Sequence, residues 1–138
     1  MKKYRKLLLI LSILNAFNTS TYAEKVLQSI ENLEQYPTTE GNHFKLSQVN
    51  LGCKIEVQFF GETGKIKENY IFKQQKLRYA ARYDVHYSHG GLSNLSENKG
   101  KFNTQQKRIE LDPKAPKTLA DFREYLALFP QTDLTRCS

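Results

Sequence analysis

The chain has 138 residues, of which 21 are lysine or arginine and 14 are aspartate or glutamate, and its formal net charge is +7. This length suits a single small domain with one hydrophobic core. Four of the basic residues and none of the acidic ones precede Glu24, so the rest of the chain carries a net charge of +3. Since that remainder has no dense basic run, the composition argues against a nucleic-acid-binding protein.

Residues 1–23 have the organisation of a secretory signal peptide. The first six residues include four basic ones, residues 7–14 form a short apolar run, and Thr21 and Ala23 flank Tyr22 as a cleavage site. The apolar run is too short to span a bilayer, and no later segment is apolar enough to do so. The short lysine-rich start is typical of bacteria. We therefore expect an exported, periplasmic or secreted protein, with residues 24–138 as its single mature domain.

Cys53 and Cys137 are the two cysteines of the chain. Cysteine pairs persist as disulfides in oxidising compartments, so we expect these two to be bonded. The bond would join the C-terminal tail to a core strand, and the chain-entropy model assigns it about 4–5 kcal/mol of stabilisation. A catalytic role for either thiol is therefore not expected.

The first element of the mature chain is predicted to be an amphipathic helix over residues 24–35. Its apolar residues recur at helical spacing, as Val26, Leu27, Ile30 and Leu33. The helix should end before Pro37, because proline disfavours the helical conformation of the residue that precedes it.

Residues 43–51 predict a less regular strand. Its apolar residues change parity between Leu46 and Val49. A β-bulge near Ser47-Gln48 would bring both sets onto one face.

Three regularly alternating strands follow, over residues 53–60, 65–73 and 76–88. Such alternation is typical of antiparallel strands with one buried face. A four-residue turn at 61–64 would place Ile55 opposite Tyr70, and a two-residue turn at Gln74-Gln75 would place Tyr70 opposite Tyr79. Both registers put apolar residues opposite apolar residues, as a buried face requires. A longer loop stays open at the second turn, because Gln-Gln is unusual in a tight hairpin.

This register directs the tyrosines of residues 76–88 inward and the basic residues outward. Lys67, Arg78 and Arg82 then form a candidate binding face, with Lys67 directly opposite Arg82. Like charges in that position destabilise a sheet, so an anionic partner could relieve the repulsion. The alternative is an ordinary solvated face.

Glu68 falls on the inward face in the same register. A buried carboxylate is costly unless it is paired, and the hydroxyls of Tyr79 and Tyr83 could serve as partners. The alternatives are a structural role and contact of these three residues with a ligand in an incompletely filled core.

The C-terminal part predicts a polar loop over residues 89–101, a strand over 107–111 and a second helix. That helix would begin at Thr118 as N-cap and end at Pro130. Its apolar stripe would be Leu119, Phe122, Leu126 and Phe129. The element order predicts an α+β fold: an antiparallel meander of four or five strands, with the N-terminal and C-terminal helices packed on one face.

Two clusters of side chains resemble chemical sites. Asp84, His86 and His89 resemble metal ligands, but zinc sites need three or four protein ligands and His89 has the opposite strand parity. Ser88 and His89 precede two glycines, yet no strand-Ser-helix elbow accompanies them. We therefore expect no metal, no cofactor and no enzymatic activity.

These observations favour an exported protein that binds another macromolecule, in the manner of an inhibitor or an immunity protein, through the charged outer face of its sheet. The partner would be a protein or an anionic component of the cell envelope, and neither nucleic acid nor a stable membrane span is expected. The alternative is a carrier of a small ligand between sheet and helices. A cavity of several hundred Å³ would favour the carrier, and a packed core the macromolecular binder.

Overall fold

The computed structural model describes residues 23–88, 91 and 103–138. Its six strands form one antiparallel sheet in chain order: β1 (Lys25–Glu31), β2 (Asn42–Val49), β3 (Gly52–Phe60), β4 (Gly64–Lys73), β5 (Lys76–Tyr87) and β6 (Thr104–Leu111). Three short helices follow: α1 (Pro116–Leu126), α2 (Gln131–Leu134) and the 3₁₀ turn η2 (Thr135–Cys137). The predicted α+β antiparallel meander is confirmed, with six strands in place of four or five. Residues 1–22 of the predicted signal peptide lie outside the described part of the chain.

The predicted N-terminal helix is wrong, because residues 25–31 form strand β1 along the edge of β2. The register of this pair shifts between Val26 and Gln28. That bulge lets Leu27 and Ile30 both pack against the core, although they are three residues apart. A spacing of three is shared by a helix and a bulged strand, and pairing with β2 decides between them.

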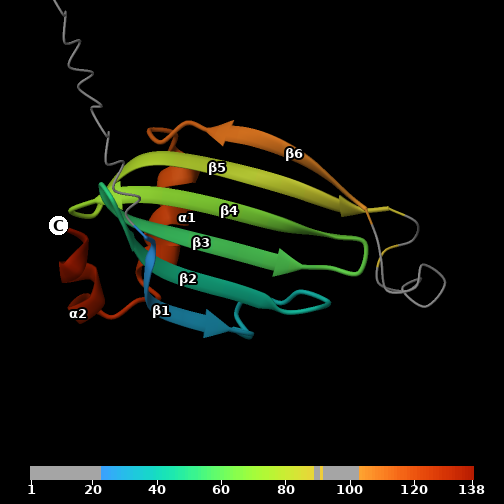
Figure 1. The fold of residues 1–138 in the computed structure, drawn as a ribbon, viewed down its shortest axis with the longest axis horizontal. Helices are drawn as coiled ribbons and strands as arrows, with labels where there is room; N and C mark the ends of the chain where they lie inside the picture. The colour runs from blue at the N-terminus through green and yellow to red at the C-terminus, as the bar shows by residue number, and fades with distance from the viewer. Residues whose placement is uncertain (1–22, 89–90, 92–102) are drawn as a thin grey trace, which may run out of the picture.

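Helix α1 crosses one face of the sheet, and the opposite face bears no helix of the described chain (Figure 1). Under the helix, Phe122 lies 5.3 Å from Phe72 and 6.1 Å from Tyr70 between ring centroids. The helix begins at Pro116, with Ala115 as N-cap, and Thr118 is buried inside it. The predicted start at Thr118 is therefore wrong, because proline at the first helical position carries no N–H that would need a partner.

The predicted disulfide is confirmed: Cys53 and Cys137 are bonded, with their Cα atoms 5.2 Å apart. Both residues are buried, and Cys137 is the last residue of the C-terminal turn η2. The backbone N–H of Gln74 donates to the carbonyl of Cys137 over 3.1 Å. The tail therefore holds both β3 and the β4–β5 turn.

The predicted register of β3 with β4 is confirmed along the whole pair, including Ile55 opposite Tyr70. The bulge predicted near Ser47-Gln48 is wrong, because β2 pairs with β3 without interruption. Leu51 lies in the following turn and is 74% exposed, so no bulge is needed to bury it.

The predicted register of β4 with β5 is correct only next to the turn. Gln74 and Gln75 do form a two-residue turn, with φ of 50° and 58°, and Phe72 pairs with Leu77. The register then shifts by one residue, so that Tyr70 faces Ala80 and not Tyr79. A one-residue shift exchanges the faces of every later side chain. We call the face of the sheet that α1 crosses the helix side, and the opposite face the helix-free face. Beyond the bulge, the tyrosines of β5 lie on the helix-free face, and Arg82 lies on the helix side.

No helix in the described residues is both long enough and apolar enough to cross a membrane.

Candidate ligand-binding site

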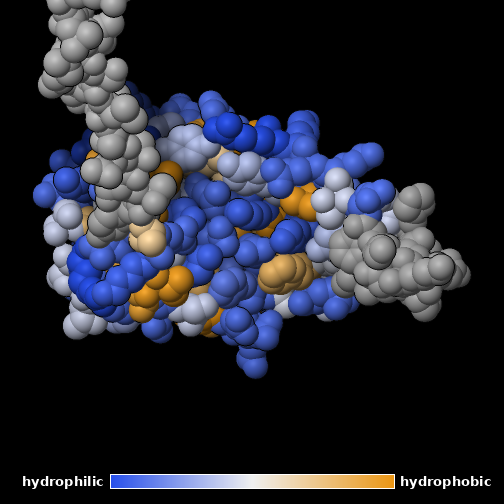
Figure 2. Space-filling view, in the orientation of Figure 1, coloured by the Kyte–Doolittle hydropathy of each residue, from blue (hydrophilic) through white to orange (hydrophobic). Residues whose placement is uncertain are grey.

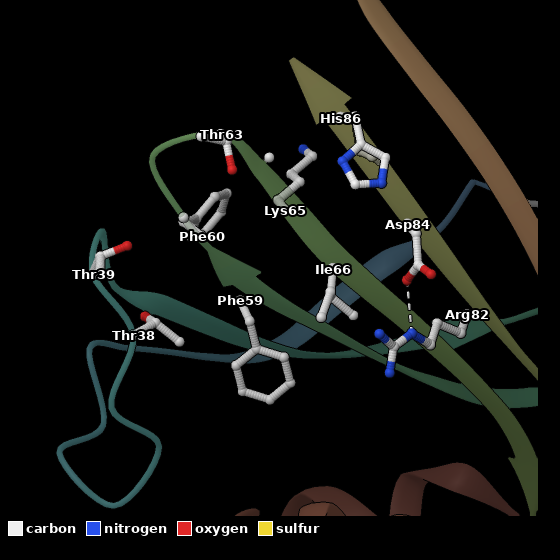
Figure 3. A pocket seen from close by; sticks show the side chains of 13 residues that line it. Thr38, Thr39, Phe59, Phe60, Thr63, Lys65, Ile66, Arg82, Asp84 and His86 are labelled. Carbon is white, nitrogen blue, oxygen red and sulfur yellow. Dashed lines mark hydrogen bonds and ion pairs between the residues drawn. The ribbon is translucent and has the colours of Figure 1, made fainter. Parts of the chain in front are cut away.

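Helix α1 covers one end of the helix-side face of the sheet (Figure 1). Beyond that end the face has a hollow, whose lining side chains are drawn in Figure 3. Its volume is about 420 Å³, and it is lined by the ends of β3 and β5, the start of β4 and the loop before β2. The curvature of the sheet and the short length of α1 leave this end of the face without a covering helix or strand among the residues that the structure describes. It is therefore the place where a ligand could contact the buried-face side chains.

The floor of the hollow is apolar. Phe59 of β3 pairs with Ile66 of β4 across the strands, and the two side chains project to the same side of the sheet (Figure 3). Phe59 also contacts the core, because its ring centroid lies 5.9 Å from that of Phe44. Thr38 and Thr39 contribute methyl groups and hydroxyls at the rim.

One wall of the hollow is charged. The Nε of Arg82 donates to the Oδ1 of Asp84 over 2.7 Å, and this hydrogen bond raises the pKa of the guanidinium. The Nη1 of Arg82 lies 4.0 Å from the Oε1 of Glu68, which is 8% exposed. The guanidinium extends from β5 toward Ile66 and Phe59 (Figure 3). It is thus held by its Asp84 side and presented toward the apolar floor.

Glu68 connects this wall to the core. Its Oε2 accepts a hydrogen bond from the hydroxyl of Tyr70 over 2.8 Å. Burial, and then the neighbouring Glu68 carboxylate, raise the pKa of Tyr70, so the hydroxyl remains a donor at neutral pH. The predicted partners of Glu68 are therefore wrong: Tyr70 and Arg82 pair with it, while Tyr79 and Tyr83 lie on the other face.

The structure also separates the predicted binding face. Lys67 lies on the helix-free face, and Arg82 lies on the helix side. Arg78 is exposed at the β5 bulge, near the β4–β5 turn. The predicted opposition of Lys67 and Arg82 is wrong, since Lys67 faces Tyr83 and Arg82 faces Glu68. The repulsion expected between Lys67 and Arg82 therefore does not occur, although Lys73 does face Lys76 beside the β4–β5 turn.

The helix-free face carries a row of compensated charges. Glu56, 7% exposed, lies 3.4 Å from the Nζ of Lys45 and 3.3 Å from that of Lys67. Burial would raise the pKa of Glu56, but the two lysines outweigh it and the net pKa is below the ordinary value of 4.5. Figure 2 shows this face as mostly hydrophilic, with small hydrophobic areas.

Sequence reasoning missed the hollow and two of its floor residues, Phe59 and Ile66. Both had been assigned correctly to the inward face, so the missing information was where α1 stops covering that face. Asp84 and His86 had been weighed as metal ligands and line the hollow instead.

No cluster of three or more metal-ligating side chains occurs within the described ranges. His89, which the sequence analysis grouped with Asp84 and His86 and also with Ser88, lies outside the described residues, and so does Gly90.

Comparison with protein-family models, with curated proteins and with solved structures found no match for this chain.

Proposed function

We propose that this chain is an exported, non-enzymatic protein that binds a small ligand in the hollow on the helix side of its sheet. The observation that carries the proposal is the hollow itself, at about 420 Å³. Ligand sites are typically concave, measure roughly 300–1,000 Å³, and combine an apolar lining with a few placed polar groups. Phe59 and Ile66 supply the apolar part here, and Arg82 with Asp84 supplies the polar part.

The disulfide supports the exported location. Bonds of this kind persist in oxidising compartments, and the Cys53–Cys137 bond is formed between two buried residues. Together with the signal-like residues 1–23, this bond supports a function in the periplasm or outside the cell.

A binding role fits the electrostatics of the wall better than catalysis does. Arg82, Asp84 and Glu68 are engaged with one another, and Tyr70 donates to Glu68. A general acid or base must be free to exchange a proton with the substrate. Groups neutralised by each other are instead suited to orienting a bound molecule.

A second candidate is a macromolecular partner, either a protein or an anionic envelope component, on the helix-free face. Its support is a cation–aromatic pair: the Cζ of Arg108 lies 5.9 Å from the ring centroid of Tyr79, and its Nη2 also donates to the Tyr79 hydroxyl over 2.6 Å. Lys67 lies similarly 5.7 Å from the ring centroid of Tyr83. Tyrosine and arginine are enriched at protein interfaces. An inhibitor or immunity protein would use these residues, and of the trio predicted from the sequence only Lys67 is among them.

The two candidates are separated by a matched pair of variants on β4. Ile66→Gln changes the floor of the hollow, whereas Ile71→Gln makes the same replacement on the helix-free face. We expect the fluorescent probe anilinonaphthalene sulfonate to bind the folded wild type saturably at one site. Ile66→Gln should weaken that binding about tenfold, since part of a buried aliphatic contact is lost, and Ile71→Gln should leave it unchanged. Equal affinities for the three proteins would rule out the hollow as the site.

A further inference from the structure

We propose that the hollow recognises a carboxylate group carried on an apolar chain, and that Arg82 is the residue that binds it. This inference rests on the proposed function, because it names the chemical class of ligand for the same site. It is carried by two observations: the fixed orientation of Arg82, and the match of volume and floor to an aliphatic chain.

Asp84 fixes the orientation of the Arg82 guanidinium. Asp84 takes the Nε–H, over 2.7 Å, and this is the one hydrogen bond of the guanidinium within the described residues. The contact of Nη1 with Glu68, at 4.0 Å, is an ion pair too long for a hydrogen bond. A guanidinium has five N–H donors, so those on the two terminal nitrogens remain for a ligand. Their planar fork matches the two oxygens of a carboxylate.

The charges beside the hollow are close to balance. Asp84 and Glu68 are the acidic residues of the wall, and each is already engaged with Arg82. Lys107 of β6 lies opposite Asp84 in the register. Lys65 also lines the hollow, but its Nζ donates to Gln58 over 3.2 Å and lies 5.7 Å from the ring centroid of Phe60, on the helix-free face. The guanidinium of Arg82 is therefore the cationic group that the hollow presents to a ligand.

The size of the floor limits the rest of the ligand. A water-sized group occupies roughly 30 Å³, so a hollow of about 420 Å³ has room for about fourteen non-hydrogen atoms. A carboxylate with about eight to twelve carbons fits within that limit. Its chain would lie over Ile66 and Phe59, which the guanidinium faces (Figure 3). Two sources share this chemistry: a free fatty acid, and the C-terminus of an apolar peptide.

The head group is tested on the wild-type protein by calorimetric titration with decanoate and with decan-1-ol. The two ligands share an aliphatic chain, and only decanoate offers a charged bidentate acceptor. We expect decanoate to bind about tenfold to a hundredfold more tightly, as is typical of hydrogen bonds to charged groups. Equal affinity for the alcohol would overturn the proposed role of Arg82, although the hollow would still be a binding site. Failure of both ligands and of the fluorescent probe would instead overturn the proposed function.

The residue is tested by comparing Arg82→Lys with Arg78→Lys. Both variants keep the positive charge, but only the first removes a fork from the hollow, because Arg78 is exposed at the bulge. We expect Arg82→Lys to lose about tenfold or more in decanoate affinity and none in decanol affinity. Arg78→Lys should match the wild type for both ligands. If Arg82→Lys bound decanoate as the wild type does, the assignment would be wrong; if it did not fold, the titration of the wild type would decide.

The source of the carboxylate is distinguished by a further pair of ligands. An acetylated peptide ending in Leu-Val is titrated with a free and with an amidated C-terminus. Tighter binding of the free peptide than of decanoate would identify a peptide terminus, and the reverse order would identify a fatty acid. Absence of discrimination between the free and amidated peptides, together with equal decanoate and decanol affinities, would contradict carboxylate recognition from either source.

Discussion

The two ends of the helix-side face are built from the same strands, yet they have different chemistry. At the end that α1 covers, Phe72 and Tyr70 of β4 are fully buried against Phe122. Two and four residues before Tyr70, on the same face, Glu68 is 8% exposed and Ile66 lies at the open hollow. The strand therefore runs from aromatic core to charged wall with its pairing to β3 uninterrupted.

This difference indicates that coverage by α1, and not strand alternation, sets which inward positions tolerate charge. Under the helix, any polar group must find a partner inside the protein or lose its hydration. Beyond the helix, Arg82 and Asp84 remain partly in contact with solvent while they pair with each other. The covered end should hold the fold together, and the open end should hold the ligand.

The largest effect on stability is expected when the disulfide at the covered end is removed. Replacing Cys53 and Cys137 together by alanine opens a link across 84 residues of sequence. We expect the free energy of unfolding to fall by about 4–5 kcal/mol, because the unfolded chain regains the entropy that the link removed. The urea midpoint of the double variant measures this loss. Reduction of the wild type with a thiol is the control and should give the same midpoint, whereas a loss below about 1 kcal/mol would show that the tail stays docked without the bond.

Two phenylalanines, one at each end of the helix-side face, test whether the covered end contributes more to stability than the open end. Phe72→Ala, under α1, should cost about 3–5 kcal/mol, the usual range when a fully buried aromatic side chain is removed from a core. Phe59→Ala, at the hollow, should cost about half as much, since that side chain is only partly buried. Chemical denaturation followed by circular dichroism gives both values. For probe binding the order should reverse, with Phe59→Ala the more damaging; a larger stability loss at Phe59 would mean that the hollow is closed in solution.

The smallest effect is expected on the helix-free face, which serves as a reference for both ends. The pKa of Glu56 is lowered in the folded state, so its carboxylate contributes stability above pH 4.5 that is lost as the pH falls through the folded-state pKa. Glu56→Gln should therefore be less stable than the wild type near pH 7 and should converge with it in acid. Urea midpoints measured from pH 7 to pH 3 test this, and ligand affinity at neutral pH should not change. A constant difference between the two proteins across that range would show that the ion pairs with Lys45 and Lys67 contribute no stability.

The amino-acid sequence by itself determined the features that depend on local pattern and on chemistry between unlike residues. Alternation over β3 and β4, with a short glycine-bounded turn between them, was sufficient for their register. Two cysteines following a signal-like segment were sufficient for the disulfide. In each case a wrong pairing would have moved apolar side chains to solvent or left a thiol unpaired, so one arrangement was strongly favoured.

Tertiary structure alone decided the remaining features, because there the local pattern fits two arrangements equally well. Leu27 and Ile30 fit a helix or a bulged strand, and β2 supplies the hydrogen bonds that select the strand. In β5 the tyrosines alternate with charged or small residues, and the adjacent Ala80 and Ala81 fit either face, so a bulge at Arg78 could invert the faces without violating the pattern. The candidate site depends on that inversion, which brings Arg82 to Glu68, and on the length of α1, which leaves Phe59 and Ile66 uncovered. The periodicity of one strand predicts neither the bulge nor how far a helix covers a curved sheet, because both are set by packing between elements distant in the chain.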